Sequence, residues 1–294
     1  MKWQEFGRSD NVEDRRGQSG GPIGGRGGIG IGTIIVLGLI GWALGIDPRL
    51  LIGGAEMVNK MRQGTQTETT QPGQTGTPSD DMGQFVAAIL AANETVWSEV
   101  LPDQKGIAYV KPKLVLYSGR TTSGCGGAMS AMGPFYCPRD QKVYLDTSFF
   151  QDMKRRLGGG GDFAYAYVIS HEIGHHVQNL LGILPKVQAA QQRAASQGNE
   201  PGANNLSVRV ELMADCLAGV WAANTERKYR FLQPGDLESA VATAQAIGDD
   251  RLQKSSQGYA VPDSFTHGTS AQRVQWLSTG LKSGEVDSCN TFAQ

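Results

Sequence analysis

Two histidines on one predicted helix give the clearest sign of chemistry in this chain. They stand four residues apart in His171-Glu172-Ile173-Gly174-His175. A helix brings residues at that spacing to one face, where two neutral imidazoles can share a tetrahedral zinc ion. Glu172 is placed to take a proton from water that zinc activates. The alternative is an incidental histidine pair on a polar face, which is disfavoured because two of the chain's 4 histidines fall in this pattern.

A catalytic zinc site needs a third protein ligand, and Glu211 is the best candidate. It lies in Val210-Glu211-Leu212-Met213-Ala214-Asp215, on a second predicted helix. Asp215 is one turn further along the same face, where it can accept the outer N–H of a ligating histidine. A half-buried helix has little reason to point two carboxylates inward unless a cation receives them. Two alternatives are an exposed acidic pair beside Arg209 and a site in which Asp215 is the ligand.

The other two histidines lie outside this pattern. His176 follows His175 directly and points about 100° away from it, so we expect it to support the fold or the ligands. His267, in a predicted loop, could donate a hydrogen bond to the oxyanion of a tetrahedral intermediate, or could be a surface or packing residue. Tyr136 and Tyr144 are weaker candidates for the same donor role.

Composition excludes one class of partner. The chain has 294 residues and a formal net charge of -1. It contains no block of Lys and Arg interleaved with aromatic residues, so nucleic acid is not an expected partner. The length allows a membrane anchor, a linker and one domain of about 200 residues.

Residues 29–46 form an uncharged apolar stretch, IGIGTIIVLGLIGWALGI. Its length reaches the lower end of what a membrane-spanning helix needs, roughly 17 to 25 residues. A buried helix of the soluble domain is the alternative, which the glycines within the stretch disfavour. Arg15, Arg16 and Arg26 precede it, which mildly favours a cytoplasmic N-terminus. The sequence thus predicts one N-terminal transmembrane helix.

All four cysteines, Cys125, Cys137, Cys216 and Cys289, follow that stretch. An even number on one side of a membrane favours an oxidising compartment and two disulfides. Of the three possible pairings we favour Cys125 with Cys137 and Cys216 with Cys289. Four unpaired buried thiols are the alternative. A cysteine zinc site is disfavoured because no two cysteines stand two to four residues apart.

The expected organisation has four parts. Residues 1–28 are predicted to be a flexible cytoplasmic head and residues 29–46 the anchor. Residues 47–80 end in a Thr/Gln/Gly/Pro tract that predicts a linker. Residues 81–294 are predicted to form the folded domain.

Periodicity predicts mixed helices and strands, hence an α+β fold. A helix is expected to begin after a cap at Asp80 or Asp81, and residues 186–205 are expected to form an exposed insertion. Asp162 is the predicted cap of the helix that carries the histidine pair. The other expected elements are a strand at 113–117, a hairpin formed by 133–137 and 142–145, and helices at 147–157, 163–181, 206–224 and 234–254.

Several of these stretches together resemble the bacterial neutral zinc metallopeptidase family of YpfJ-like membrane proteins. The resemblance covers nearly the whole chain. The stretches that carry it are 8–17 (RSDNVEDRRG), 134–138 (PFYCP), 171–178 (HEIGHHVQ), 211–216 (ELMADC) and 267–273 (HGTSAQR). The resemblance implies peptide hydrolysis.

More broadly, the chain looks like the gluzincins, in which a glutamate from a downstream helix completes the zinc ligands. The Glu-x-x-x-Asp spacing of thermolysin-like enzymes maps onto Glu211 and Asp215. By the same analogy, the hairpin at 133–145 is the upper edge of a cleft that binds an extended peptide by strand addition.

The sequence therefore predicts a zincin-like α+β peptidase with one catalytic Zn2+, acting on peptide or protein substrates. It is expected in the bacterial inner membrane as a single-pass protein, with a cytoplasmic N-terminus and a periplasmic catalytic domain. One alternative is a non-catalytic membrane-anchored envelope protein that binds zinc for structure. Another is the same enzyme with its domain in the cytoplasm.

Overall fold

The computed structural model describes residues 1–17, 73–156 and 160–293. These ranges belong to one compact unit. The predicted transmembrane helix at 29–46, and most of the predicted linker, lie outside the described residues. Within the described ranges, no helix is both long and apolar enough to cross a membrane.

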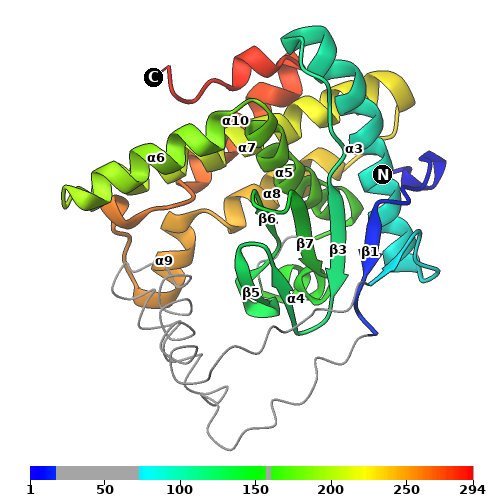
Figure 1. Cartoon of the computed structure of the whole chain (residues 1–294), viewed down its shortest axis with the longest axis horizontal. Helices are drawn as coiled ribbons and strands as arrows, with labels where there is room; N and C mark the ends of the chain where they lie inside the picture. Colours follow the sequence, from blue (N-terminus) through cyan, green and yellow to red (C-terminus); the bar gives the residue numbers. More distant parts are fainter. Residues whose placement is uncertain (18–72, 157–159, 294) are drawn as a thin grey trace, which may run out of the picture. The chain divides into compact units, whose positions relative to one another are not determined.

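A five-stranded sheet runs in the order β2-β1-β3-β7-β6 (Figure 1). β1, β3 and β7 are mutually parallel, whereas β2 and β6 are antiparallel strands at the two edges. The predicted strand and hairpin are confirmed. The strands are β1 (Val12–Asp14), β2 (Gln74–Thr75), β3 (Lys113–Tyr117), β6 (Phe135–Cys137) and β7 (Lys142–Asp146).

Alternation along β3 divides its side chains between two apolar clusters. Leu114 and Leu116 join the main core with the helices. Val115 and Tyr117 point to the other face, into a small cluster that includes Tyr144. This division is what the two-residue repeat of a strand produces when both faces are covered. A small hairpin formed by β4 (Arg120–Ser123) and β5 (Gly126–Met129) covers part of the face that carries Val115 and Tyr117.

The prediction of a flexible head is wrong for residues 1–17. Val12, in β1, is fully buried and pairs with Leu114 of β3. Phe6 is 4% exposed and packs against Phe231. Buried apolar side chains and a strand inside the sheet fix this segment to the fold. The folded unit therefore includes residues on both sides of the predicted anchor and does not begin near residue 81.

Helices form the other layer of this mixed α+β fold, and the main core lies between them and the sheet. The predicted cap of α3 is confirmed, since the Asp80 side chain accepts from the Gly83 N–H. The predicted helices at 147–157 and 163–181 are also confirmed. The helices are α3 (Asp81–Lys105), α4 (Ser148–Arg156), α5 (Asp162–Leu180), α6 (Ile183–Ser196), α7 (Glu200–Tyr229), α8 (Asp236–Ala246), α9 (Asp249–Gln257) and α10 (Ser270–Ser283).

Three details of the helical prediction differ from the structure. The stretch at 186–205, predicted to be an exposed insertion, is mostly exposed, but it is helical and is shared between α6 and the start of α7. The single helix predicted at 234–254 is broken into α8 and α9 at Gly248, whose backbone is extended (φ -70°, ψ 141°). Gly248 packs so tightly against Ser270 that a Cβ there would clash. Asp162 does not cap α5. It is the first residue of that helix, and its carboxylate accepts from the Trp3 indole N–H at 3.1 Å.

Both favoured disulfides are confirmed. Cys125 pairs with Cys137, which ties the loop between β4 and β5 to β6. Cys216 of α7 pairs with Cys289, which fixes the C-terminal segment to the core. No described cysteine is free.

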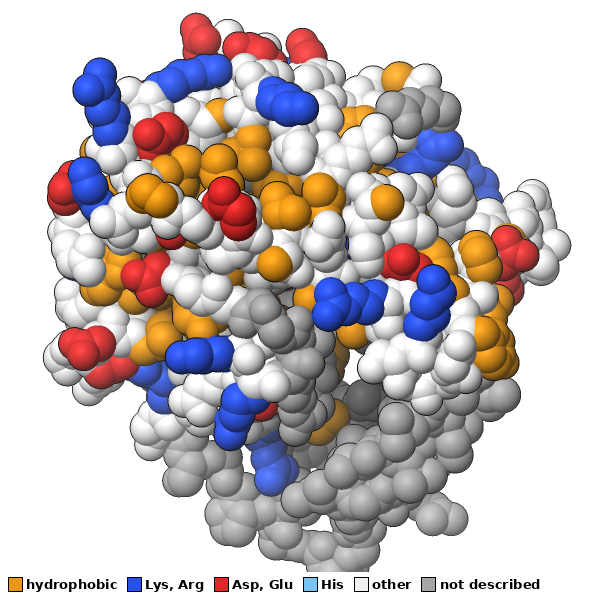
Figure 2. All heavy atoms as spheres, turned by 180° about the vertical axis from the view of Figure 1, so that it is seen from behind, with side chains coloured by type: hydrophobic (Ala, Val, Ile, Leu, Met, Phe, Trp, Pro, Cys, Tyr) orange, Lys and Arg blue, Asp and Glu red, His pale blue; other side chains and the backbone are white. Residues whose placement is uncertain are grey.

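The face of the molecule turned away from the view of Figure 1 carries charges of both signs. Figure 2 shows Lys and Arg side chains interspersed with Asp and Glu side chains, with small apolar areas between them. Over the whole chain, 27 Lys and Arg residues are nearly balanced by 28 Asp and Glu residues. A surface of this kind does not set up a field of one sign over that face.

Candidate metal centre

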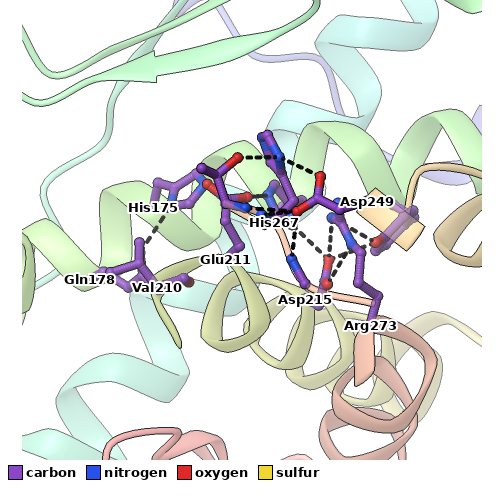
Figure 3. Close-up of polar contacts among 12 residues, drawn as sticks. His175, Gln178, Val210, Glu211, Asp215, Asp249, His267 and Arg273 are labelled. Atoms are coloured by element: carbon purple, nitrogen blue, oxygen red, sulfur yellow. Dashed lines mark hydrogen bonds and ion pairs between the residues drawn. The ribbon is translucent and has the colours of Figure 1, made fainter. Parts of the chain in front are cut away.

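Helices α5 and α7 bring three metal-ligating side chains together. His171 and His175 face Glu211 across the helix pair, and one donor atom from each residue lies within 4.8 Å of the other two. His171 Nε2 is 3.1 Å from Glu211 Oε2, and His175 Nε2 is 3.6 Å from Glu211 Oε1. Figure 3 shows Glu211 of α7 on the side of that helix that faces His175 of α5. The predicted set of three residues therefore converges on one point.

A glycine on α5 permits this close approach of the two helices. A Cβ on Gly174 would lie 3.0 Å from the Ala214 carbonyl oxygen and 3.2 Å from the Ala214 Cα. The absence of a side chain between the two histidines thus lets the α7 backbone press directly against α5. Glu211 lies one turn before Ala214 and is thereby brought level with the histidine pair.

The outer nitrogen of each histidine is held by a separate partner. His171 Nδ1 lies 2.8 Å from Asp215 Oδ1, and His175 Nδ1 lies 2.9 Å from Gln178 Oε1. Both oxygens are acceptors, so each Nδ1 carries a hydrogen, and each Nε2 is the nitrogen that faces Glu211. The alternative of an exposed acidic pair is wrong, since the Asp215 side chain is 0% exposed and that of Glu211 21%.

Comparison with known proteins relates the sequence of this chain to a family. The sequence pattern of the family described as "Putative neutral zinc metallopeptidase" matches residues 1–292.

The chain belongs to this family.

Relatives that match over much of their length occur in two bacteria. "Uncharacterized protein YpfJ" of Escherichia coli K12 is 48% identical over 300 residues, which cover 100% of this chain and 99% of the relative. "Uncharacterized protein Rv2575" of Mycobacterium tuberculosis H37Rv is 42% identical over 227 residues, which cover 72% of this chain and 73% of the relative. No solved structure matches the chain.

The donor set suits the zinc ion for which this metallopeptidase family is named. Zinc binds imidazole nitrogen and carboxylate oxygen at about 2.0 to 2.2 Å, so tetrahedral donors lie about 3.3 to 3.6 Å apart. The distances of 3.1 and 3.6 Å to Glu211 lie close to that separation. Burial lowers the pKa of His171, but Asp215 and Glu211 more than offset this and raise it to about 10. The surroundings of His171 therefore favour positive charge.

Asp215 is the centre of a buried network behind the ligands. Arg273 of α10 binds it with two nitrogens, Nε to Oδ2 and Nη2 to Oδ1, each at 2.9 Å. The Tyr167 hydroxyl donates to Oδ1 at 2.6 Å. Burial raises the pKa of Asp215, but Arg273 and His171 outweigh it and lower the pKa below its usual value. Asp215 contacts the outer nitrogen of His171, as expected of a residue that orients a ligand.

A loop after α9 brings His267 to the same site. Asp249 fastens the loop, because its Oδ2 accepts from the backbone N–H groups of Thr266, His267 and Gly268 at 2.8, 2.6 and 3.1 Å. Its Oδ1 lies 3.2 Å from His267 Nδ1. Burial lowers the pKa of His267, but Asp249 and the nearby charge of Glu211 raise it above its usual value. Figure 3 shows His267 beside the ligand group.

The remaining candidates have structural roles. His176 is fully buried, and its Nδ1 meets the Tyr136 hydroxyl at 2.9 Å while its Nε2 meets the Val110 carbonyl at 2.6 Å. Tyr136 is therefore committed to joining β6 to α5. The Tyr144 hydroxyl donates to Asp140 at 2.7 Å on the other side of the sheet. The suggestion that either tyrosine stabilises an oxyanion is wrong for this arrangement.

Sequence reasoning missed four residues of the site: Tyr167, Gln178, Asp249 and Arg273. Gln178 could have been found, since it lies one turn after His175 on the same face of the predicted helix. Tyr167 lies one turn before His171 on α5 and could have been found in the same way. Asp249 and Arg273 lie on separate helices, and only the folded chain brings them to the ligands.

Proposed function

We propose that this chain is a peptidase in which His171, His175 and Glu211 hold one zinc ion. The observation that carries the proposal is the convergence of these three donors from two helices, within 4.8 Å of one another. Membership of the metallopeptidase family supports the identity of the metal and the type of reaction. The α5–α7 pair beside an antiparallel edge strand is compatible with a zincin-like domain.

The size of the ligand set favours catalysis over a structural role. Structural zinc sites have four protein ligands, whereas catalytic sites have three and keep a position open. Within the described chain, this group has three members. His267 lies nearby but is bound to Asp249 through Nδ1. This favours an enzyme over a non-catalytic envelope protein that binds zinc for structure.

When bound, zinc would supply a Lewis acid and lower the pKa of a coordinated water to about 7. Glu172 directly follows His171 on α5 and is 7% exposed, so it is largely shielded from solvent. In the proposed mechanism, Glu172 accepts a proton from the attacking water. It then returns that proton to the nitrogen that leaves when the peptide bond breaks.

His267 is the proposed hydrogen-bond donor to the substrate carbonyl oxygen as negative charge develops on it. The contact from Nδ1 to Asp249 leaves Nε2 as the nitrogen available to the substrate. A donor that is held in place before reaction needs no reorganisation when the charge appears. Asp249 acts through His267 and is a positioning residue.

The substrate is proposed to lie along β6. This strand is at the edge of the sheet and has β7 as its neighbour there. The contact between Tyr136 and His176 fixes β6 to the helix that carries the ligands. An extended peptide could add to the outer edge of β6, with main-chain hydrogen bonds giving affinity for many sequences. The proposed substrates are therefore extended or unfolded polypeptides.

Two disulfides within the folded unit favour a location outside the cytoplasm. The apolar segment at 29–46 stays a predicted site of membrane contact, so a membrane-associated enzyme is part of the proposal.

The test is digestion of a denatured protein by the full-length chain, with and without a zinc chelator. We expect hydrolysis that the chelator removes and that added zinc restores. Glu172→Gln should lose hydrolysis, whereas Glu200→Gln, an exposed control at the start of α7, should keep it. Equal hydrolysis by Glu172→Gln and the parent contradicts the mechanism. If the parent binds zinc and cleaves nothing, the non-catalytic alternative is favoured.

A further inference from the structure

Residues 18–72 are inserted into a β-hairpin. β1 and β2 are antiparallel neighbours, with Glu13 opposite Thr75 and Asp14 opposite Gln74. The Gly76 N–H donates to the Val12 carbonyl at 3.0 Å, and the Gly73 N–H to the Glu13 carboxylate at 3.4 Å. The points at which this segment leaves and rejoins the described fold therefore lie side by side.

The strand before the insertion is bound firmly into the unit. Glu94 of α3 accepts from Ser9 and from Asn11, each at 2.7 Å. Glu13 is 4% exposed and pairs with Lys142 of β7 at 2.8 Å. Removing one partner from a buried ion pair leaves an uncompensated charge, which is strongly destabilising. The first 17 residues therefore cannot detach from the folded unit without a large loss of stability.

Two arginines that favoured a cytoplasmic N-terminus have a different explanation. Arg15 is 9% exposed, pairs with Glu13 at 2.7 Å and donates to the Thr122 carbonyl at 3.0 Å. Arg16 pairs with Asp14 at 2.6 Å and with Asp80 at 2.5 Å. Their charges are neutralised within the fold. The positive-inside rule concerns charges that flank a membrane segment, so these two arginines say little about which side of the membrane the N-terminus occupies.

We infer that residues 1–17 lie in the same compartment as the catalytic unit, on the oxidising side of the membrane. A strand cannot sit between β2 and β3 while a hydrocarbon layer about 30 Å thick separates it from them. The insertion must therefore begin and end on one side of any membrane that it meets. This replaces the predicted single-pass topology, in which the N-terminus was cytoplasmic and the domain periplasmic. The two disulfides within the unit identify the shared side.

Cysteine labelling of the full-length chain in intact spheroplasts tests this topology. Gly7→Cys places a thiol in the N-terminal segment, where a Cβ meets nothing within 4 Å. Tyr259→Cys places one on the catalytic unit, at a side chain that is 62% exposed. Lys2→Cys is a second exposed N-terminal position in case the first variant does not fold. The parent is the blank, because its cysteines are all in disulfides.

A membrane-impermeant maleimide should label the N-terminal and domain variants equally before lysis, with no further increase after lysis. Labelling of Tyr259→Cys alone would restore the single-pass topology and overturn the inference. Labelling of neither variant until lysis would place both segments in the cytoplasm and overturn the assigned side. This outcome does not depend on peptidase activity.

Discussion

Gln178 holds His175 by its outer nitrogen and at the same time bridges the two ligand helices. Its Oε1 lies 2.9 Å from His175 Nδ1, and its Nε2 donates to the Val210 carbonyl at 2.7 Å. A carbonyl can only accept, so the amide nitrogen must face Val210 and the amide oxygen must face the imidazole. The backbone next to Glu211 thereby selects the tautomer of His175 whose Nε2 is free to bind metal.

Replacing Gln178 with leucine should therefore weaken zinc binding. Loss of such outer partners typically lowers metal affinity by about 10- to 100-fold. Competition titration with a fluorescent chelator would measure the change. Gln197→Leu, at an exposed position after α6, is the matched control and should bind zinc like the parent. An unchanged affinity in Gln178→Leu would show that the amide does not prepare His175.

Arg273→Met should destabilise the fold. The substitution keeps much of the side-chain volume but leaves Asp215, which is 0% exposed, without its cation. Breaking a buried pair in this way costs about 3 to 5 kcal/mol. Urea unfolding of the metal-free protein would measure it. If the double variant Arg273→Met/Asp215→Asn is as unstable as Arg273→Met alone, the unpaired charge is not the cause.

His267→Phe should slow peptide hydrolysis without loss of zinc. Removing one donor to a developing oxyanion costs about 10²- to 10³-fold in kcat. Asp249→Asn should act in the same direction because it weakens the contact that orients His267. Steady-state kinetics on a peptide, together with zinc content, would check both. A fall in zinc content that matches the fall in rate would argue instead for a role in metal binding.

Acid should weaken the tie between the N-terminal segment and α3. Hydrogen bonding to Arg16 lowers the pKa of Asp80 to about 2, against an ordinary value of 3.8. A lowered folded-state pKa stabilises the protein fully above about pH 4, and the contribution is lost as pH falls toward 2. Asp80→Asn keeps a good helix cap but removes the charge. The free energy of unfolding, measured as a function of pH, should fall less steeply for this variant than for the parent between pH 4 and 2. Equal slopes would contradict the assigned role.

The N-terminal hairpin makes a further prediction about truncation. Replacing residues 18–72 with about five Gly and Ser residues should give a folded protein that binds zinc, since β1 and β2 need only a short loop. A chain that begins at residue 73 should be much less stable, because it lacks Phe6 and Val12 of the core. Circular dichroism and thermal unfolding would compare the two. Equal stability would show that β1 is dispensable.

Local spacing was enough to predict the part of the site that lies on two helices. The four-residue interval between His171 and His175, and that between Glu211 and Asp215, each place side chains on one face. These intervals depend on helix geometry, which a sequence shows directly. The cysteine pairing was only favoured among three possibilities: Cys125 and Cys137 are 12 residues apart, whereas Cys216 and Cys289 are 73 residues apart and meet only in the folded chain.

The N-terminal strand could not be found in this way. Val12–Asp14 is too short to show alternation, and Glu13 and Arg15 look like solvated charges. Their burial makes sense once Lys142, 129 residues later, is brought beside Glu13. Asp249 and Arg273 were missed for the same reason, since their partners lie on other elements.

The division of roles between Glu172 and Glu211 is the central claim, and zinc content after dialysis tests it most directly. The account predicts about one zinc per chain in the parent and in Glu172→Gln, and a large loss of zinc in Glu211→Ala. Retention of zinc by Glu211→Ala, or its loss from Glu172→Gln, would contradict the proposed ligand set.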